Sequence, residues 1–158
     1  MHTQDEFVHF LVRAKQNTYA ALGDGATVSP LLPGAHQLEY EEGYKLYRDV
    51  YFGGDFFVGQ ETVYEDSVPV WCMGYAGGLV DGVDPNLQTA PVYAFLQDAL
   101  RRVEVERPYR GPHIYQQGEY AFSDSGEGHI GNFWGVETVT MSQKLIYRLR
   151  YHGGFIRE

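Results

Sequence analysis

The chain has 158 residues and a formal net charge of −9, a length that fits one domain with its own hydrophobic core. A surface this acidic repels phosphate backbones, so we expect no direct nucleic-acid binding. The one cysteine cannot form an internal disulfide, and neither a signal peptide nor an apolar run of membrane-spanning length is visible. These features predict a cytoplasmic protein with no membrane partner.

A first helix is predicted over residues 4–16. Thr3 and Glu6 fit a capping box that satisfies free amides at the helix start. The residues that follow fall at helical spacing on one apolar stripe, which comprises Phe7, Phe10, Leu11 and Ala14. Residues 18–35 contain several glycines and prolines and are expected to form an irregular connection.

A meander of hairpins is predicted next. Its strands are rich in aromatic and β-branched residues and are separated by turn residues. They cover residues 36–40, 44–52, 56–65 and 68–76. A loop rich in Gly and Asp is expected over residues 77–85.

The second helix is predicted over residues 89–104, with Thr89 as a good cap. Its apolar stripe comprises Val92, Phe95, Leu96, Ala99, Leu100 and Val103. The segment 107–112 (RPYRGP) is expected to be a stiff connection because two prolines restrict it. Three more strands are predicted over residues 117–122, 132–140 and 144–151.

This order of elements indicates one α+β domain over residues 1–158, a single antiparallel sheet of about six to seven strands with two helices packed on one face. No internal repeat and no linker are apparent. Residues 126–131 match G-x-G-x-x-G, but a strand follows where a dinucleotide site needs a helix, so a flexible hairpin loop is expected. The histidines lack metal-ligand spacing, and Cys72 is expected to be a small buried residue. No metal and no cofactor are therefore predicted.

The hairpin around residues 53–55 can be given a register from the pattern. A three-residue loop there matches apolar residues across the two strands, whereas a two-residue loop would oppose apolar and charged residues. The preferred register pairs Phe52 with Phe56 and Val50 with Val58. Asp49 and Glu61 then become diagonal neighbours on one face of the sheet, near enough to share one ligand or one proton.

A three-residue turn over residues 66–68 would add the next strand to the same face. That face carries Tyr47, Asp49, Tyr51, Phe57, Gly59, Glu61, Trp71, Met73 and Tyr75. Aromatic rings with a few converging polar groups are typical of small-ligand sites, and rings with carboxylates suit a cation. Arg110 is expected on the opposite wall. The predicted ligand-binding residues are Tyr47, Asp49, Tyr51, Glu61, Trp71, Tyr75 and Arg110. In the alternative interpretation, Asp49 and Glu61 pair with Arg148 or Arg150, or face water.

Several short motifs follow one another in an order that resembles the bacterial domain of unknown function 5680 family. They are Thr18-Tyr19-Ala20, Pro33-Gly34-Ala35-His36 with Tyr40, residues 47–54, 59–63, 69–75 and 107–112, and His152-Gly153-Gly154. The resemblance covers nearly the whole chain. It implies a domain that often follows a helix-turn-helix DNA-binding domain in bacterial transcription regulators. This chain is expected to depart from that arrangement, because its first helix starts at about residue 4.

Three functions are compatible with these patterns. The leading hypothesis is a ligand-binding or sensor domain that uses the aromatic and acidic face. The first alternative is a small enzyme in which Asp49 and Glu61 perform acid–base chemistry, because closely spaced carboxylates can split their pKa values. A cleft without a strongly shifted carboxylate would favour binding over catalysis. The second alternative is an interaction module that forms a homodimer through an exposed sheet edge or face.

Overall fold

The computed structural model describes residues 3–21, 23 and 25–158. It contains two helices, α1 (Gln4–Gln16) and α2 (Thr89–Leu100), and eight strands. The strands are β1 (His36–Glu42), β2 (Lys45–Gly53), β3 (Phe56–Glu65), β4 (Val68–Leu79), β5 (Ile114–Gln117), β6 (Tyr120–His129), β7 (Asn132–Met141) and β8 (Lys144–Phe155).

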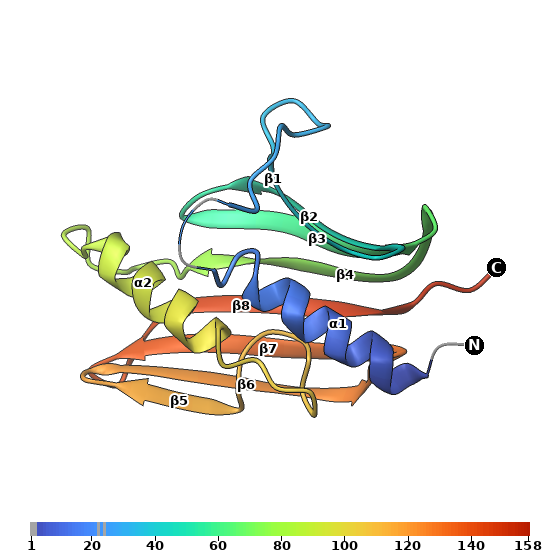
Figure 1. Cartoon of the computed structure of the whole chain (residues 1–158). Helices are drawn as coiled ribbons and strands as arrows, with labels where there is room; N and C mark the ends of the chain where they lie inside the picture. Colours follow the sequence, from blue (N-terminus) through green and yellow to red (C-terminus); the bar gives the residue numbers. More distant parts are fainter. Residues whose placement is uncertain (1–2, 22, 24) are drawn as a thin grey trace.

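The strands form one antiparallel sheet in the order β1-β2-β3-β4-β8-β7-β6-β5. Both helices lie on the same face of this sheet (Figure 1), so the predicted α+β class is confirmed. The predicted strand count is wrong, because the sheet has eight strands and not six to seven. The strand expected over residues 117–122 is instead divided between the end of β5, a two-residue turn and the start of β6, and Gly118 in that turn has a φ of 60°.

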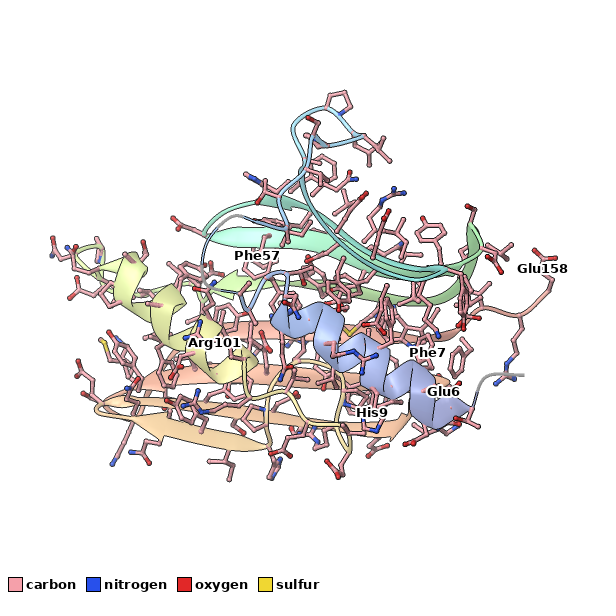
Figure 2. All side chains as sticks on the ribbon, viewed as in Figure 1. Glu6, Phe7, His9, Phe57, Arg101 and Glu158 are labelled. Carbon is pink, nitrogen blue, oxygen red and sulfur yellow. The ribbon has the colours of Figure 1, made fainter. Side chains whose placement is uncertain are left out.

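The hydrophobic core lies between the helices and the covered face of the sheet. Phe7 lies near the N-terminal end of α1 (Figure 2) and packs against Trp71 of β4 and Phe155 of β8. The hydroxyl of Thr3 accepts a hydrogen bond from the amide of Glu6, as a capping residue does. On α2, Phe95 is buried and stacks on aromatic residues of the β5–β6 hairpin. The two apolar stripes therefore face the sheet as predicted.

Several predicted boundaries are wrong. Helix α2 ends at Leu100 rather than at residue 104, although Val103 is still buried in the turn that follows. Strand β4 continues to Leu79 through residues expected to form a loop. Gly77 fits there because a Cβ atom would lie 2.3 Å from the carbonyl oxygen of Arg148 on β8. The two glycines that suggested a loop thus allow a close approach of strands.

The β2–β3 hairpin has a three-residue loop, but the loop lies one residue further along the chain than predicted. Gly53 pairs with Phe57, and Asp49 pairs directly with Glu61 rather than diagonally. Gly53 has a φ of 98°, a conformation that favours glycine and explains the position of the loop. The pairing is shifted by one residue on each strand, which leaves every side chain on the face that was predicted for it. Asp49 and Glu61 therefore do share one face.

The β3–β4 hairpin differs from the prediction in two ways, and the two differences cancel. Its turn has two residues, Asp66 and Ser67, with φ angles of 48° and 67°. A register shift between Val63 and Tyr64 then restores the phase of the strands. As a result, the predicted inner residues of β4 lie on the same face as Glu61, namely Trp71, Met73 and Tyr75.

The segment 126–131 is not a flexible loop. Residues 126–129 belong to β6, and only Ile130 and Gly131 separate β6 from β7. The segment is therefore part of a tight β-hairpin, consistent with the lack of a dinucleotide-binding context.

The structure shows an internal repeat that the sequence analysis missed. The halves α1–β4 and α2–β8 have the same order of elements and meet where β4 pairs with β8. Both inner hairpins have a register shift at the same place and a two-residue turn with positive φ angles. One constant interval separates the identical residues of β3–β4 and β7–β8, which are Phe57/Phe133, Gly59/Gly135, Glu61/Glu137, Thr62/Thr138, Val63/Val139, Tyr75/Tyr151, Gly77/Gly153 and Gly78/Gly154.

Neither helix in the described residues is long and apolar enough to cross a membrane.

Candidate functional site

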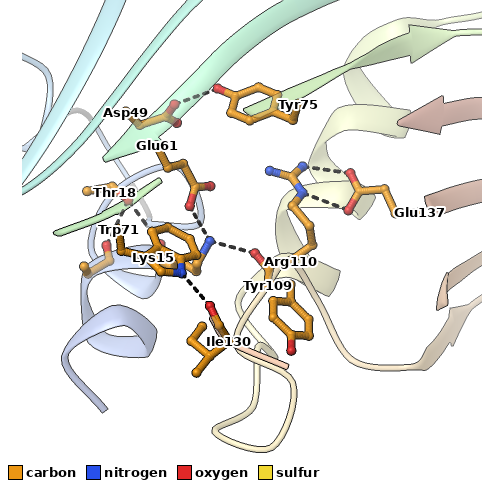
Figure 3. Close-up of polar contacts among 11 residues, drawn as sticks. Lys15, Thr18, Asp49, Glu61, Trp71, Tyr75, Tyr109, Arg110, Ile130 and Glu137 are labelled. Carbon is orange, nitrogen blue, oxygen red and sulfur yellow. Dashed lines mark hydrogen bonds and ion pairs between the residues drawn. The ribbon is translucent and has the colours of Figure 1, made fainter. Parts of the chain in front are cut away.

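Polar and charged side chains are buried on the helix-covered face of the sheet, between α1, the central strands and the connection that follows α2 (Figure 3). Asp49 is 2% exposed and Glu61 is fully buried. They occupy directly opposite positions on β2 and β3. Two carboxylates so placed repel each other unless cations or protons compensate them.

Glu61 is compensated by a lysine from α1. The ammonium group of Lys15 is fully buried and forms an ion pair with Glu61 Oε2. It also donates a hydrogen bond of 2.6 Å to the carbonyl oxygen of Tyr109. Burial lowers the pKa of Lys15, and the charge of Glu61 opposes this effect. Lys15 thereby joins α1, the sheet and the connection after α2.

Glu137, the repeat partner of Glu61, is compensated by Arg110. The guanidinium donates two hydrogen bonds to this carboxylate, from Nε at 2.9 Å and from Nη2 at 2.7 Å. The hydroxyl of Tyr147 donates a third at 2.6 Å. Burial lowers the pKa of Arg110, but the charge and hydrogen bonds of Glu137 outweigh it, so the pKa lies above its ordinary value. This bidentate pair fixes the guanidinium in the interior.

Asp49 lacks such a cation. The hydroxyl of Tyr75 donates a hydrogen bond of 2.6 Å to Asp49 Oδ1, and no lysine or arginine in the described part of the chain forms an ion pair with this carboxylate. Burial and the charge of Glu61 raise the pKa of Asp49 to about 7, although the bond from Tyr75 acts in the opposite direction. Asp49 therefore changes its charge near neutral pH.

Asp124 is the repeat partner of Asp49 and has the same hydrogen bond. The hydroxyl of Tyr151 donates to Asp124 Oδ1 at 2.7 Å, and Arg107 Nη2 lies 3.8 Å from the same oxygen. Burial and the charge of Glu137 raise the pKa of Asp124 to about 6. Each half of the domain thus contains one buried aspartate held by a tyrosine.

A cavity of about 720 Å³ lies beside Asp49, between α2 and the inner face of β2–β4. Aromatic rings form much of its wall, together with apolar residues of α2. The lining comprises Tyr19, His36, Asp49, Tyr51, Gly53, Gly54, Asp55, Phe57, Tyr75, Thr89, Ala90, Tyr93, Ala94, Leu96, Gln97, Leu100 and Arg110. The hydroxyl of Tyr19 is buried and has no hydrogen-bond partner among the residues described.

Two hydrogen-bonded contacts hold α2 over this cavity. The hydroxyl of Tyr93 donates to the carbonyl oxygen of Gly54 at 3.2 Å, which links α2 to the tip of the β2–β3 hairpin. The amide of Gln97 donates to the carbonyl oxygens of Tyr19 and Ala21 at 3.2 and 2.7 Å. Helix α2 is therefore fixed both to the β2–β3 hairpin and to the segment after α1.

The predicted site residues divide into two groups. Asp49, Tyr51, Tyr75 and Arg110 line the cavity. The others are fully buried and do not line it, and these are Tyr47, Glu61 and Trp71. Trp71 donates a hydrogen bond of 3.0 Å to the carbonyl oxygen of Ile130.

The alternative pairing of Asp49 and Glu61 with Arg148 or Arg150 is wrong. Both arginines are exposed and alternate along β8 with buried residues, so they lie on the other face of the sheet. The partner of Glu61 is Lys15, which the sequence analysis missed. A signal was present, because Lys15 follows Leu11 by four residues and thus continues the apolar stripe of α1.

Cys72 is half-buried rather than buried and lies on the uncovered face. Burial raises the pKa of its thiol, which disfavours the reactive thiolate. A second hollow of about 580 Å³ lies on the same face, around Gly74, His152 and Gly154. In residues 3–21, 23 and 25–158, no cluster of three or more His, Cys, Asp or Glu side chains could hold a metal ion.

The fold and the site together define an α+β domain with a duplicated sheet and one aromatic cavity next to a buried acid. The chain belongs to the family described as Domain of unknown function (DUF5680), whose model matches residues 49–156. Comparisons with curated proteins and with solved structures gave no match. The matched region begins at Asp49, within β2, and contains strands β3 to β8 and both buried aspartates, so these features are part of the family domain.

Proposed function

We propose that this domain binds a small molecule in the cavity beside Asp49. The observation that carries the proposal is a cavity of about 720 Å³ that is lined by several aromatic rings and by a buried carboxylate without a cation partner among the described residues. Small-ligand sites commonly enclose about 300–1,000 Å³ and combine apolar walls with a few polar groups. A sensor role, as expected from the resemblance to regulator-attached domains, rests on this same cavity.

The tethering of α2 supports a preformed site. Tyr93 and Gln97 fix the helix to the hairpin tip and to the segment after α1. A cavity whose walls are already held in place loses less conformational entropy when a ligand enters. We therefore expect binding without a large rearrangement of the sheet.

Acid–base catalysis is a second candidate, and one observation favours it. The pKa of Asp49 is raised to about 7 by burial and by Glu61, which is the range in which a carboxyl group can exchange protons at neutral pH. The predicted pair of catalytic carboxylates has less support, because Glu61 is bonded to Lys15 and does not line the cavity. Only Asp49 of the two could reach a substrate.

The test is a thermal-shift screen of a metabolite library, run on the wild type and on a variant with a filled cavity. Ala94 is exposed on α2 and lines the cavity, so Ala94→Trp should block it. His9 occupies the corresponding position on α1, since Phe10 and Leu11 correspond to Phe95 and Leu96. His9→Trp therefore serves as the matched control.

Binding in the cavity predicts compounds that raise the melting temperature of the wild type and of His9→Trp but not of Ala94→Trp. Hits that act equally on all three proteins would place the ligand elsewhere and contradict the proposal. The catalytic alternative predicts in addition that a hit is chemically changed by the wild type and remains unchanged, although bound, with Asp49→Asn. Mass spectrometry of the incubated compound measures this difference.

Self-association stays a prediction of the sequence. The uncovered face of the sheet carries exposed apolar side chains, which include Phe52, Phe56, Val58 and Trp134. Sedimentation of the wild type and of Val58→Asp would test it, because a dimer through this face should dissociate when a charge is placed among its apolar side chains.

A further inference from the structure

We infer that the cavity takes an organic cation, in which an ammonium or similarly charged group is carried on an apolar or aromatic body. This inference rests on the proposed function and names the class of ligand. It combines the charges around the floor of the cavity with the arrangement of its aromatic walls.

The first argument is the distribution of buried charge. Lys15 pairs with Glu61, and Arg110 pairs with Glu137. In the second half of the domain, Arg107 lies 3.8 Å from Asp124. Asp49 alone among the four buried carboxylates forms no ion pair with a described residue. One negative charge is therefore uncompensated when Asp49 is ionised, and it lies at the cavity.

The second argument is the aromatic wall around that charge. His36 stacks on Tyr51 at a ring distance of 4.8 Å, and Tyr51 meets Phe57 edge-on at 6.3 Å. Phe57 in turn meets Tyr75 edge-on at 6.0 Å. Tyr93 of α2 lines the cavity with them. Aromatic rings attract a cation through their quadrupoles, most strongly where water is excluded.

An anionic ligand fits the site less well. The guanidinium of Arg110 already donates two hydrogen bonds to Glu137 and lies 5.2 Å from the ring centre of Tyr19 and 5.6 Å from that of Tyr75. Its charge is thus largely satisfied within the protein. An anion would also approach Asp49, which repels it above neutral pH.

The inference predicts a dependence of affinity on pH. With a pKa of about 7, Asp49 is largely protonated at about pH 6 and largely ionised at about pH 8. A cation should therefore bind about tenfold more tightly at the higher pH and should release a proton when it binds at the lower one. The charged and titratable groups that act on Asp49 come from four other segments, and they are Lys15, Glu61, Tyr75 and Arg110.

The experiment compares three aromatic probes of similar size but different charge. These are benzyltrimethylammonium, benzyl alcohol and benzoate, titrated by calorimetry into the wild type at about pH 8. We expect measurable binding of the ammonium probe and weaker binding of the other two. Asp49→Asn keeps an oxygen that can accept the hydrogen bond from Tyr75 but removes the charge. It should therefore lower the affinity for the ammonium probe by more than about tenfold. Asp124→Asn, the equivalent change in the other half, should leave the affinity within about twofold.

The pH dependence provides a second readout. The tenfold gain between about pH 6 and pH 8 should disappear in Asp49→Asn. It should persist in His36→Gln, which removes an imidazole that lines the cavity.

Other outcomes separate this inference from the proposed function. One contrary outcome is binding of benzoate or benzyl alcohol that Ala94→Trp abolishes and Asp49→Asn leaves unchanged. That outcome would overturn the inference that the ligand is a cation, but it would support the ligand site. Equal effects of Asp49→Asn and Asp124→Asn on the ammonium probe would also overturn it, because only the first residue lines the cavity. Absence of ammonium binding at millimolar concentration, at either pH, would overturn it as well. Failure of the whole library screen would instead reject the ligand site itself.

Discussion

The two halves of the domain contain the same buried constellation, and the cavity of about 720 Å³ borders the first of them. Asp49 and Tyr75 in the first half correspond to Asp124 and Tyr151 in the second, and both hydroxyls donate to the aspartate at nearly equal distances of 2.6 and 2.7 Å. The difference lies in what covers them. In the second half, Tyr109 stacks on Phe133 at 4.4 Å and lies 6.1 Å from the ring of Tyr151.

In the first half, no ring among the described residues stacks on Phe57 as Tyr109 stacks on Phe133. Phe57 corresponds to Phe133, and its ring and that of Tyr75 line the cavity. The chain therefore fills one of two equivalent spaces and leaves the other open. A cavity with a polar group in its wall is occupied by water or by a ligand, whereas cavities that stay empty are apolar. Because this space retains an acid, we interpret it as a binding site.

The largest expected effect comes from breaking the two buried ion pairs. Lys15→Met leaves Glu61 buried without its cation, and Arg110→Met does the same to Glu137, so each should lower the free energy of unfolding by about 3–5 kcal/mol. Arg13→Met, which breaks the exposed pair with Glu42, is the control and should cost at most about 1 kcal/mol. Urea denaturation measures all three.

A second substitution distinguishes a lost charge pair from lost packing. Adding Glu61→Gln to Lys15→Met removes the uncompensated carboxylate and should recover a large part of the stability. A loss that is unchanged in the double variant would show that the methylene chain of Lys15, rather than its charge, stabilises α1.

The next prediction compares how the two aspartates make the stability of the domain depend on pH. The pKa of Asp49 is about 7 in the folded protein and that of Asp124 about 6, whereas an unfolded aspartate titrates near 4. Since the folded state keeps these protons to higher pH, stability should fall as pH rises through each window, by up to about 1.4 kcal/mol per pH unit and proton. Asp49→Asn should therefore be more stable than the wild type at pH 8, on the order of 2–4 kcal/mol.

Thermal unfolding between pH 4 and pH 8 checks this expectation. The slope that Asp49→Asn removes should extend to about pH 7, and the slope that Asp124→Asn removes should end near pH 6. A decrease in the melting temperature of Asp49→Asn at pH 8 would mean that the carboxylate is structural, with a compensating cation nearby.

Much of the fold could be predicted from the sequence, because the spacing of apolar residues along helices and their alternation along strands tolerate small errors in the position of a loop. Both helical stripes and the inner face of β2–β4 follow from the spacing of apolar residues. The prediction of this face is correct despite the error in the β2–β3 loop, since a shift of one residue on both strands leaves Asp49 and Glu61 on the same side. The misjudged turn before β4 was likewise cancelled by the register shift after Val63.

The remaining features depend on contacts between distant segments. Lys15 and Glu61 are far apart in the chain, and nothing local shows that an ammonium group in the apolar stripe of a helix meets a carboxylate on the third strand that follows. The filling of the equivalent space in the second half depends on where the connection after α2 places Tyr109, which has no periodic signal. The repeat was missed because its identical residues are scattered, and few of them fall outside the two inner hairpins.

A smaller effect compares the glycines that accommodate the two tyrosines. A Cβ atom on Gly59 would lie 2.4 Å from the hydroxyl of Tyr75, and one on Gly135 would lie 2.2 Å from that of Tyr151. The ring of Tyr75 borders the cavity and can tilt into it, whereas Tyr151 is covered by Tyr109. Within the usual range of about 1–3 kcal/mol for overpacking, Gly135→Ala should be the more destabilising. Equal losses in chemical denaturation would show that the first space is as rigid as the second.

The smallest effect should be the same in both halves, because the two inner turns have the same backbone. Ser67 and Gln143 have φ angles of 67° and 69°, a left-handed conformation that costs a residue with a side chain about 1–2 kcal/mol. Glycine avoids that cost but loses more conformational entropy on folding. Ser67→Gly and Gln143→Gly should therefore each stabilise the domain by about 0.5 kcal/mol, and their effects should add, since the sites are distant. Denaturation midpoints of the single and double variants measure this. A gain in one half and a loss in the other would show that the turns differ in solution, and the equivalence of the two halves would then not extend to their turns.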